Sequence, residues 1–177
     1  HPDGTPQQEE VLVIKPDGWS IPDKASDVHG ISTELAEEIG VPMEAALWAF
    51  IEAYEQAEVL AAHNLAFDNP VLGAEMIRYK AMPEKKVAHK VCTMKASTKF
   101  CKLPGGRNGD YKWPQLMELH IKLFGEGFDG AHDALVDVQA CAKCFFELMD
   151  KGILGLAHYD RFSPLSITGE SIDEDKE

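Results

Sequence analysis

Hydrophobic positions along the chain follow two patterns: short continuous runs and longer segments with helical spacing. Residues 11–14 and 59–62 are short apolar runs bounded by polar or turn-forming residues, so each predicts a buried strand. Residues 87–94 predict a third strand in the same way. In residues 42–54 the apolar side chains recur at helical spacing behind Pro42, which is suited to a first helical turn. These residues therefore predict an amphipathic helix.

Further helices are predicted where the same spacing returns. They lie at residues 68–79, 113–124 and 133–149. Asp68 or Asn69 is suited to cap the first of them. Residues 100–111 are rich in glycine and predict a loop. Strands that alternate with helices are typical of an α/β fold, in which helices flank a central sheet.

The length and composition suit one domain. A chain of 177 residues with 45% hydrophobic content can bury one core, which we place in residues 1–160, before a polar acidic tail at 161–177. No apolar run approaches the roughly 20 residues that span a bilayer, and the first residues lack the layout of a signal peptide. We therefore expect a soluble, cytoplasmic protein. Its four cysteines lack zinc-site spacing and are expected to be reduced packing residues.

The formal charge is uneven along the chain. A net charge of -13 disfavours a polyanionic partner, but ten of the 17 Lys and Arg residues lie in residues 78–112 with only two acidic residues. Lys99, Lys102 and Arg107 are the cations that we expect to contact nucleic acid, although a solvated surface also explains them. For Trp113 two interpretations remain open: stacking on a nucleobase, or packing in the core at the start of a helix.

Two carboxylates are placed where chemistry often occurs. Asp68 follows the strand at 59–62, and ligands usually bind at the carboxyl edge of an α/β sheet. Asp137 lies in the first turns of a predicted helix, five residues after His132. Taken alone, Asp68 also suits a helix cap and Asp137 a solvated helix position.

In their contexts these residues resemble the motifs of a nuclease family. The segment His63-Asn64-x-x-Phe67-Asp68 resembles the second motif of DEDDh-type 3′-to-5′ exonucleases, and His132-x-Ala134-x-x-Asp137 resembles their third. Val28-His29-Gly30-Ile31 resembles the family's loop at the terminal nucleotide. Lys112-Trp113-Pro114 and Leu123-Phe124-Gly125-Glu126 are similar to a phage or bacterial branch. The resemblance covers roughly residues 11–152.

This resemblance implies an RNase H-like fold with a mixed central sheet and a metal-dependent reaction. Asp68 and Asp137 would bind two Mg²⁺ or Mn²⁺ ions, which prefer carboxylate oxygens and activate water for phosphodiester hydrolysis. His132 would act as the general base, a role that suits histidine because its ordinary pKa lies near neutrality. The residues implied to bind substrate are His29, Gly30, Asn64 and Phe67.

Three nearby side chains have structural interpretations. His63 ends a predicted strand, so we expect it to make structural hydrogen bonds. Asp133 suits the start of a helix, because an acidic group there complements the helix dipole. For His29, contact with the terminal nucleotide and bracing of its own loop both remain open.

The family's first motif, Asp-x-Glu on the opening strand, is not found before Val11. The only such spacing, Asp175-Lys176-Glu177, lies in the predicted tail. We therefore expect that the opening strand is missing from this sequence and that the natural protein carries it before His1. Without that motif, metal binding should be weak and cleavage poor.

The leading hypothesis is a 3′-to-5′ exonuclease that releases 5′-mononucleotides from single-stranded DNA, with RNA as the other substrate. One alternative is a catalytically silent module that binds 3′ ends, and another is a small-RNA exoribonuclease. The sequence does not decide between DNA and RNA, because recognition of the 2′-hydroxyl depends on pocket geometry. A homodimer or a polymerase partner is compatible with each hypothesis.

Overall fold

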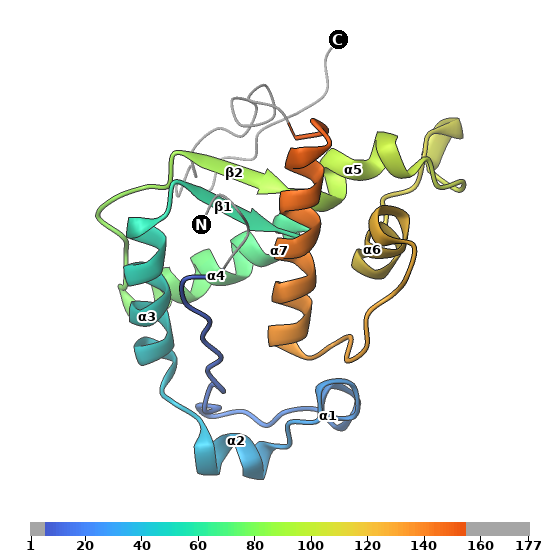
Figure 1. Cartoon of the computed structure of the whole chain (residues 1–177). Coiled ribbons are helices and arrows are strands. Elements are labelled where there is room, and N and C mark those ends of the chain that lie inside the picture. The colour runs from blue at the N-terminus through green and yellow to red at the C-terminus, as the bar shows by residue number, and fades with distance from the viewer. Residues whose placement is uncertain (1–5, 155–177) are drawn as a thin grey trace.

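Helices surround a short parallel sheet in the computed structural model, which describes residues 6–154 (Figure 1). The elements are α1 (Asp23–His29), α2 (Thr33–Ile39), α3 (Met43–Gln56), β1 (Val59–Ala62), α4 (Leu65–Tyr79), β2 (His89–Cys92), α5 (Thr93–Cys101), the 3₁₀ turn η1 (Arg107–Gly109), α6 (Leu116–Phe124) and α7 (Ala134–Asp150). The predicted α/β class is confirmed. The predicted tail at 161–177 lies outside the described residues.

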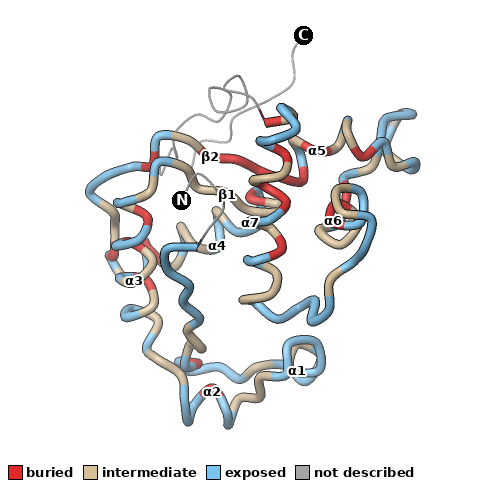
Figure 2. The backbone as a smooth tube through the Cα atoms, in the orientation of Figure 1, coloured by how far each residue is buried: buried red, intermediate tan, exposed pale blue. Residues whose placement is uncertain are grey.

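The sheet consists of β1 and β2, which pair in parallel from Val59 opposite His89 to Ala62 opposite Cys92. Helix α4 connects the strands and contacts both. Residues of β2 are mostly buried, whereas all four residues of β1 are only half-buried (Figure 2). Within residues 6–154, β2 is the only strand that pairs with β1. The two strands thus have different environments, and the more open one leads into the site described below.

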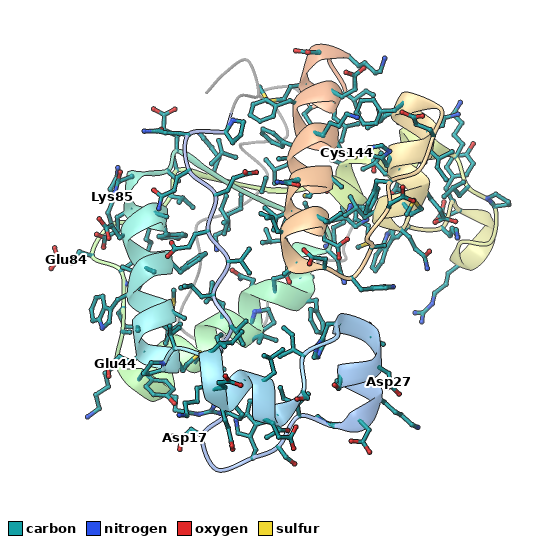
Figure 3. All side chains as sticks on the ribbon, turned by 60° about the horizontal axis from the view of Figure 1, so that its bottom comes forward. Asp17, Asp27, Glu44, Glu84, Lys85 and Cys144 are labelled. Atoms are coloured by element: carbon teal, nitrogen blue, oxygen red, sulfur yellow. The ribbon has the colours of Figure 1, made fainter. Side chains whose placement is uncertain are left out.

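The main core lies between the sheet and helices α5, α6 and α7. Val91, Leu119, Cys144 and Leu148 are almost completely buried in it. A smaller cluster between α3 and α4 includes Leu47, Ile51 and Met76. The outer surface contrasts with this interior, because Cys144 points inward while the acidic side chains labelled in Figure 3 lie on the outside. All four cysteines are free, as expected for reduced packing residues.

Several predicted elements need correction. Residues 11–14 form no strand, because only Ile14 makes a bridge, to Val41 beside α3. The strand predicted at 87–94 is shorter, and its last two residues already belong to α5. The helix predicted from 68 begins at Leu65. Helix α6 begins only at Leu116, and the short helices α1 and α2 were not predicted.

No helix within residues 6–154 is both long enough and apolar enough to cross a membrane.

Candidate active site

The first part of the site forms where β1 passes into α4. Asn64 precedes the helix with a φ of 73°, in the left-handed region that asparagine tolerates better than most residues. Asp68 follows in the first turn of α4, so it is not the helix cap. Removal from water raises the pKa of Asp68, and its own backbone N–H and the nearby His63 partly offset this rise. The carboxylate is therefore a somewhat better proton acceptor than an ordinary aspartate.

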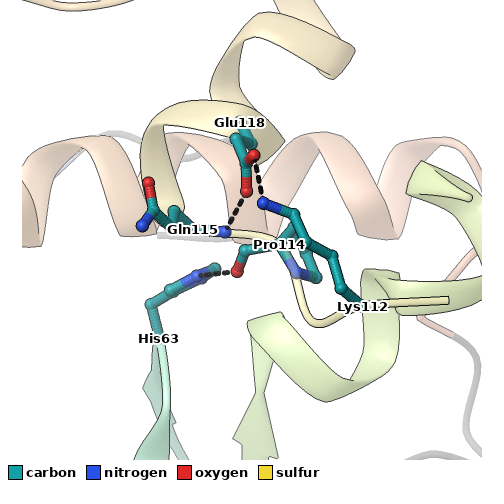
Figure 4. Close-up of polar contacts among 5 residues, drawn as sticks. All are labelled: His63, Lys112, Pro114, Gln115 and Glu118. Atoms are coloured by element: carbon teal, nitrogen blue, oxygen red, sulfur yellow. Dashed lines mark hydrogen bonds and ion pairs between the residues drawn. The ribbon is translucent and has the colours of Figure 1, made fainter. Parts of the chain in front are cut away.

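His63 fixes this turn to two other parts of the fold. Its Nε2 lies 2.9 Å from the carbonyl oxygen of Pro114, and its Nδ1 lies 3.0 Å from Oγ1 of Thr93. A carbonyl oxygen only accepts, so Nε2 must carry the proton and donate it (Figure 4). Burial lowers the pKa of His63, which favours the neutral ring. The predicted structural role of His63 is confirmed.

The second part of the site is the start of α7. Asp133 caps the helix, because its Oδ1 accepts from the N–H groups of Leu135 and Val136, as predicted. His132 precedes it with a φ of 78°. The N–H of His132 donates to Oδ2 of Asp137 over 3.3 Å. This contact joins the histidine and the carboxylate of the third motif across the first turn of the helix.

Both parts face one open cavity of about 1360 Å³. Asn64, Asp68, His132 and Asp137 all line it. The thiol of Cys141, one helical turn after Asp137, lies within electrostatic reach of both aspartates. The pKa of Cys141 is raised to about 11, mainly by burial and to a smaller extent by the two carboxylates. The fold thus brings together two acidic groups that are far apart in the sequence.

A second cavity, of about 470 Å³, lies between α1 and the start of α7. His29 and His132 both line it, so His132 borders the two cavities. The N–H of Ile31 donates to Nδ1 of His29 over 3.1 Å, which shows the loop-bracing role for this ring. Gly30 ends α1 with a φ of 75°, where a side chain would be strained. Sequence reasoning missed Trp19, an exposed indole that also lines this cavity.

The other expected substrate contacts lie outside the two cavities. Phe67 is exposed on α4 but lines neither of them. Lys99 and Lys102 lie at the exposed end of α5, and Arg107 lies on η1. Trp113 does line the large cavity and is 60% exposed, so the interpretation that it packs in the core is wrong.

The donor set for a metal ion is small. Within residues 6–154, no group of three or more His, Cys, Asp or Glu side chains could hold an ion. The pair Asp68 and Asp137 still fits the chemistry of Mg²⁺, which is often bound by one or two carboxylates together with waters and substrate phosphates. The residues present therefore suit an ion that the substrate helps to hold.

Comparison with models of known protein families identifies the family of this chain. The model of the family RNase_T, described as exonuclease, matches residues 5–145. No curated protein matches the chain.

Proposed function

The chain belongs to this exonuclease family, and from that premise we propose that it is a metal-dependent 3′-to-5′ exonuclease acting on single-stranded DNA. Membership makes the protein a nuclease whose substrate is nucleic acid. The direction of cleavage, the preference for DNA and the role of each residue are parts of the proposal.

The observation that supports it best is the shared cavity. Asp68 and His132 are 64 positions apart in the sequence, yet both line the same cavity together with Asp137. Phosphodiester hydrolysis requires charge neutralisation at the phosphate and a group that takes a proton from water. An acidic pair beside an exposed imidazole provides both kinds of group.

Asp68 and Asp137 would hold the divalent ion. When bound, Mg²⁺ or Mn²⁺ would neutralise the phosphate and lower the pKa of water, and two ions would stabilise both the attacking and the leaving oxygen. Because the pKa of Asp68 is raised, protons compete with the ion more strongly than at an ordinary aspartate. Acidification should therefore weaken metal binding at this carboxylate.

His132 would accept the proton of the attacking water. Its side chain is exposed at the border between the two cavities, where water and a substrate phosphate can both approach it. The N–H of His132 donates to Oδ2 of Asp137 over 3.3 Å, which ties the backbone of the proposed base to the carboxylate of the third motif. That arrangement lowers the entropic cost of reaching a reactive geometry.

The substrate would lie across both cavities. The smaller one is largely apolar and holds His29, so it suits the base or sugar of the terminal nucleotide. Gly30 and Asn64 would let the strand approach the backbone closely, and Phe67 would contact the preceding nucleotides. Outside the cavities, Lys99, Lys102 and Arg107 would supply the cations that a polyanion requires.

One observation favours a second candidate, a module that binds 3′ ends without cutting them. Within residues 6–154 fewer than three potential ligand side chains are grouped, which is a sparse set for a pair of ions. Such a module would use the same cavities for binding, and its affinity for single strands would not depend on a divalent ion.

A cleavage assay tests the proposal. We expect single-stranded DNA labelled at its 5′ end to shorten stepwise from the 3′ end in Mn²⁺, and to remain intact in EDTA. The matched substrate carries phosphorothioate linkages at its 3′ end and should resist. Release of the 5′ label first would contradict the proposed direction, and binding without cleavage would favour the silent module. RNA of the same sequence, cut faster than DNA, would favour the exoribonuclease.

A further inference from the structure

The side chain of Trp113 is exposed beside the carboxylates although its neighbours are anchored. Trp113 is 60% exposed, whereas Pro114 is fully buried, and Trp113 lines the cavity that holds Asp68 and Asp137. We propose that the indole of Trp113 is a platform on which a nucleobase of single-stranded nucleic acid stacks. This inference rests on the proposed function and adds a binding residue to it.

The backbone around Trp113 is fixed by its own segment. The N–H of Lys112 donates to the carbonyl oxygen of Leu103 over 2.9 Å. Its Nζ lies 2.6 Å from Oε1 of Glu118, while Oε2 of Glu118 accepts from the N–H of Gln115 over 2.8 Å (Figure 4). These hydrogen bonds, led by that from Lys112, hold the pKa of Glu118 below its usual range. The indole is therefore carried by a backbone that is held immediately before and after it.

The same segment is tied directly to the catalytic side of the sheet. The carbonyl oxygen of Pro114 accepts from Nε2 of His63, the residue that follows β1 and precedes Asn64. The position of the indole is thus coupled through a single hydrogen bond to the turn that leads to Asp68. A platform connected in this way can hold a strand in register with the carboxylates.

An uncharged contact such as stacking on Trp113 adds affinity in a cavity whose negative charge repels phosphates. Asp68 and Asp137 bring negative charge to the cavity, in a protein whose formal net charge is -13, so a phosphate backbone is repelled before an ion binds. Stacking on an aromatic ring does not depend on charge and accepts every base. The contribution of Trp113 to affinity should therefore be independent of salt, unlike that of a lysine or arginine.

Trp48 provides a matched control in the same chain. It is 50% exposed on α3, but it lines neither cavity. A general tendency of exposed indoles to bind DNA would affect Trp48 and Trp113 alike. A specific platform would affect only Trp113.

The experiment measures binding of a 5′-labelled single-stranded DNA in Ca²⁺, with cleavage in Mn²⁺ measured alongside. Trp113→Leu should weaken binding on the order of 10-fold by the same factor at each salt concentration, whereas Trp113→Phe should retain most of it. Trp48→Leu should bind as the wild type does. With abasic nucleotides placed one at a time near the 3′ end, one position should abolish the difference between wild type and Trp113→Leu.

Normal binding by Trp113→Leu, or an equal loss with every abasic substrate, would overturn the platform. The melting temperature of each variant shows whether a loss of binding reflects unfolding. A loss of binding that Trp113→Phe shares and that abasic sites do not change would be structural and would contradict the proposal. If the wild type cleaves and Trp113→Leu binds normally, only this inference fails. If the wild type neither binds nor cleaves, the proposed function fails and the platform fails with it.

Discussion

The two strands of the sheet lie side by side but face different surroundings. Val91 of β2 is completely buried in the core that it shares with residues of α5, α6 and α7, whereas the residues of β1 are half-buried and three of them border the large cavity. Polar side chains on the β2 side, such as Ser97, bond to nearby backbone. On the β1 side, Asp68 and His132 line an open space. The packed side therefore supplies stability, and the open side supplies groups that are available to a substrate.

Helix α7 connects the two environments. Cys144 and Leu148 in its second half are buried in the core, Asp137 and Val138 in its first half line the cavity, and Phe145 contacts both. Val138 is 65% exposed, although it is as apolar as the residues in the core. Since one helix carries both sets, packing of the core positions the acidic group. Changes at the two halves should accordingly separate stability from activity.

The largest expected effect is on the open half of this helix. Asp137→Asn keeps an oxygen that can accept from the N–H of His132 but removes the charge that would bind a metal ion. We expect the single-turnover rate of cleavage to fall on the order of 10³-fold, about 4 kcal/mol, with little change in melting temperature. Asp150→Asn at the other end of α7 is the control. Full activity of Asp137→Asn would remove Asp137 from the site.

On the packed half, Leu148→Ala should act on stability instead. The side chain is completely buried, so the variant loses contacts and leaves a cavity, and unfolding should become easier by about 3 kcal/mol. Denaturation with urea measures this change, and cleavage per folded molecule should stay near the wild-type value. Val138→Ala should cost less than about 0.5 kcal/mol because that side chain is exposed. Equal losses for both variants would contradict the division of α7.

Sequence reasoning located the open side better than the packed side. Asp68 and Asp137 were identified because each lies in a short motif, and the fold does bring them to one cavity. Helix α5 was missed because its buried face includes the polar residues Thr93 and Ser97, which disguise the helical pattern. The hydroxyl of Ser97 donates to the carbonyl oxygen of Thr93 in the same helix, and that of Thr93 donates to the carbonyl oxygen of Ala62 in β1. Such burial depends on contacts that only the folded chain makes.

The strand predicted at residues 11–14 shows the opposite error. An apolar run favours a strand, but a strand also needs a partner, and only Ile14 finds one, at Val41. In the same way, the sequence left two interpretations for Trp113, since exposure depends on what packs against the ring. The ion pair between Lys112 and Glu118 anchors the segment around Trp113, and the spacing of the two residues in the sequence did not predict this pair.

A further test of the open side concerns the proposed base. His132 has a φ of 78°, so His132→Asn is preferable to alanine because asparagine tolerates the left-handed region. We expect the single-turnover rate to fall on the order of 10²-fold, while affinity for DNA in Ca²⁺ changes little, because the ring takes a proton and binds no phosphate. A parallel loss of affinity would indicate that His132 organises the site instead.

A buried lysine on β2, Lys90, tests the contribution of the packed side to stability. It lies on β2 with 5% exposure, and its Nζ donates to Oδ1 of Asn69 over 3.0 Å. Burial, with a smaller contribution from Lys86, lowers the pKa of Lys90 to about 8. A pKa displaced from 10.5 to about 8 corresponds to a destabilisation of at most about 3 kcal/mol when the amine is charged. Lys90→Met removes this cost and also loses a hydrogen bond of about 1 kcal/mol, so it should stabilise the fold by up to about 2 kcal/mol at pH 7.

The stability difference between Lys90→Met and the wild type should depend on pH. The folded chain releases the proton of Lys90 near pH 8, whereas the unfolded chain keeps it until about pH 10.5, so wild-type stability gains from Lys90 as the pH rises between those values. Lys90→Met lacks this gain. Its advantage over the wild type in urea denaturation should be full below pH 8 and shrink towards pH 10.5. A constant advantage across that range would mean that the amine is not desolvated.

The smallest expected effect is on DNA affinity and comes from exposed cations that line neither cavity. Lys99, Lys102 and Arg107 are exposed at the end of α5 and on η1, and none of them lines either cavity. Changing all three to alanine should weaken binding of single-stranded DNA by about 1 kcal/mol at physiological salt and flatten the slope of log affinity against log salt. The slope should change by about two units, at about 0.7 for each lost phosphate contact. The rate at saturating substrate should remain unchanged, because these side chains lie away from the reacting atoms.

Lys24→Ala on α1, a single exposed cation elsewhere, is the control. An unaltered slope would show that the three cations are only solvated surface, and the path of the strand would then have to follow Trp113 and the cavities alone.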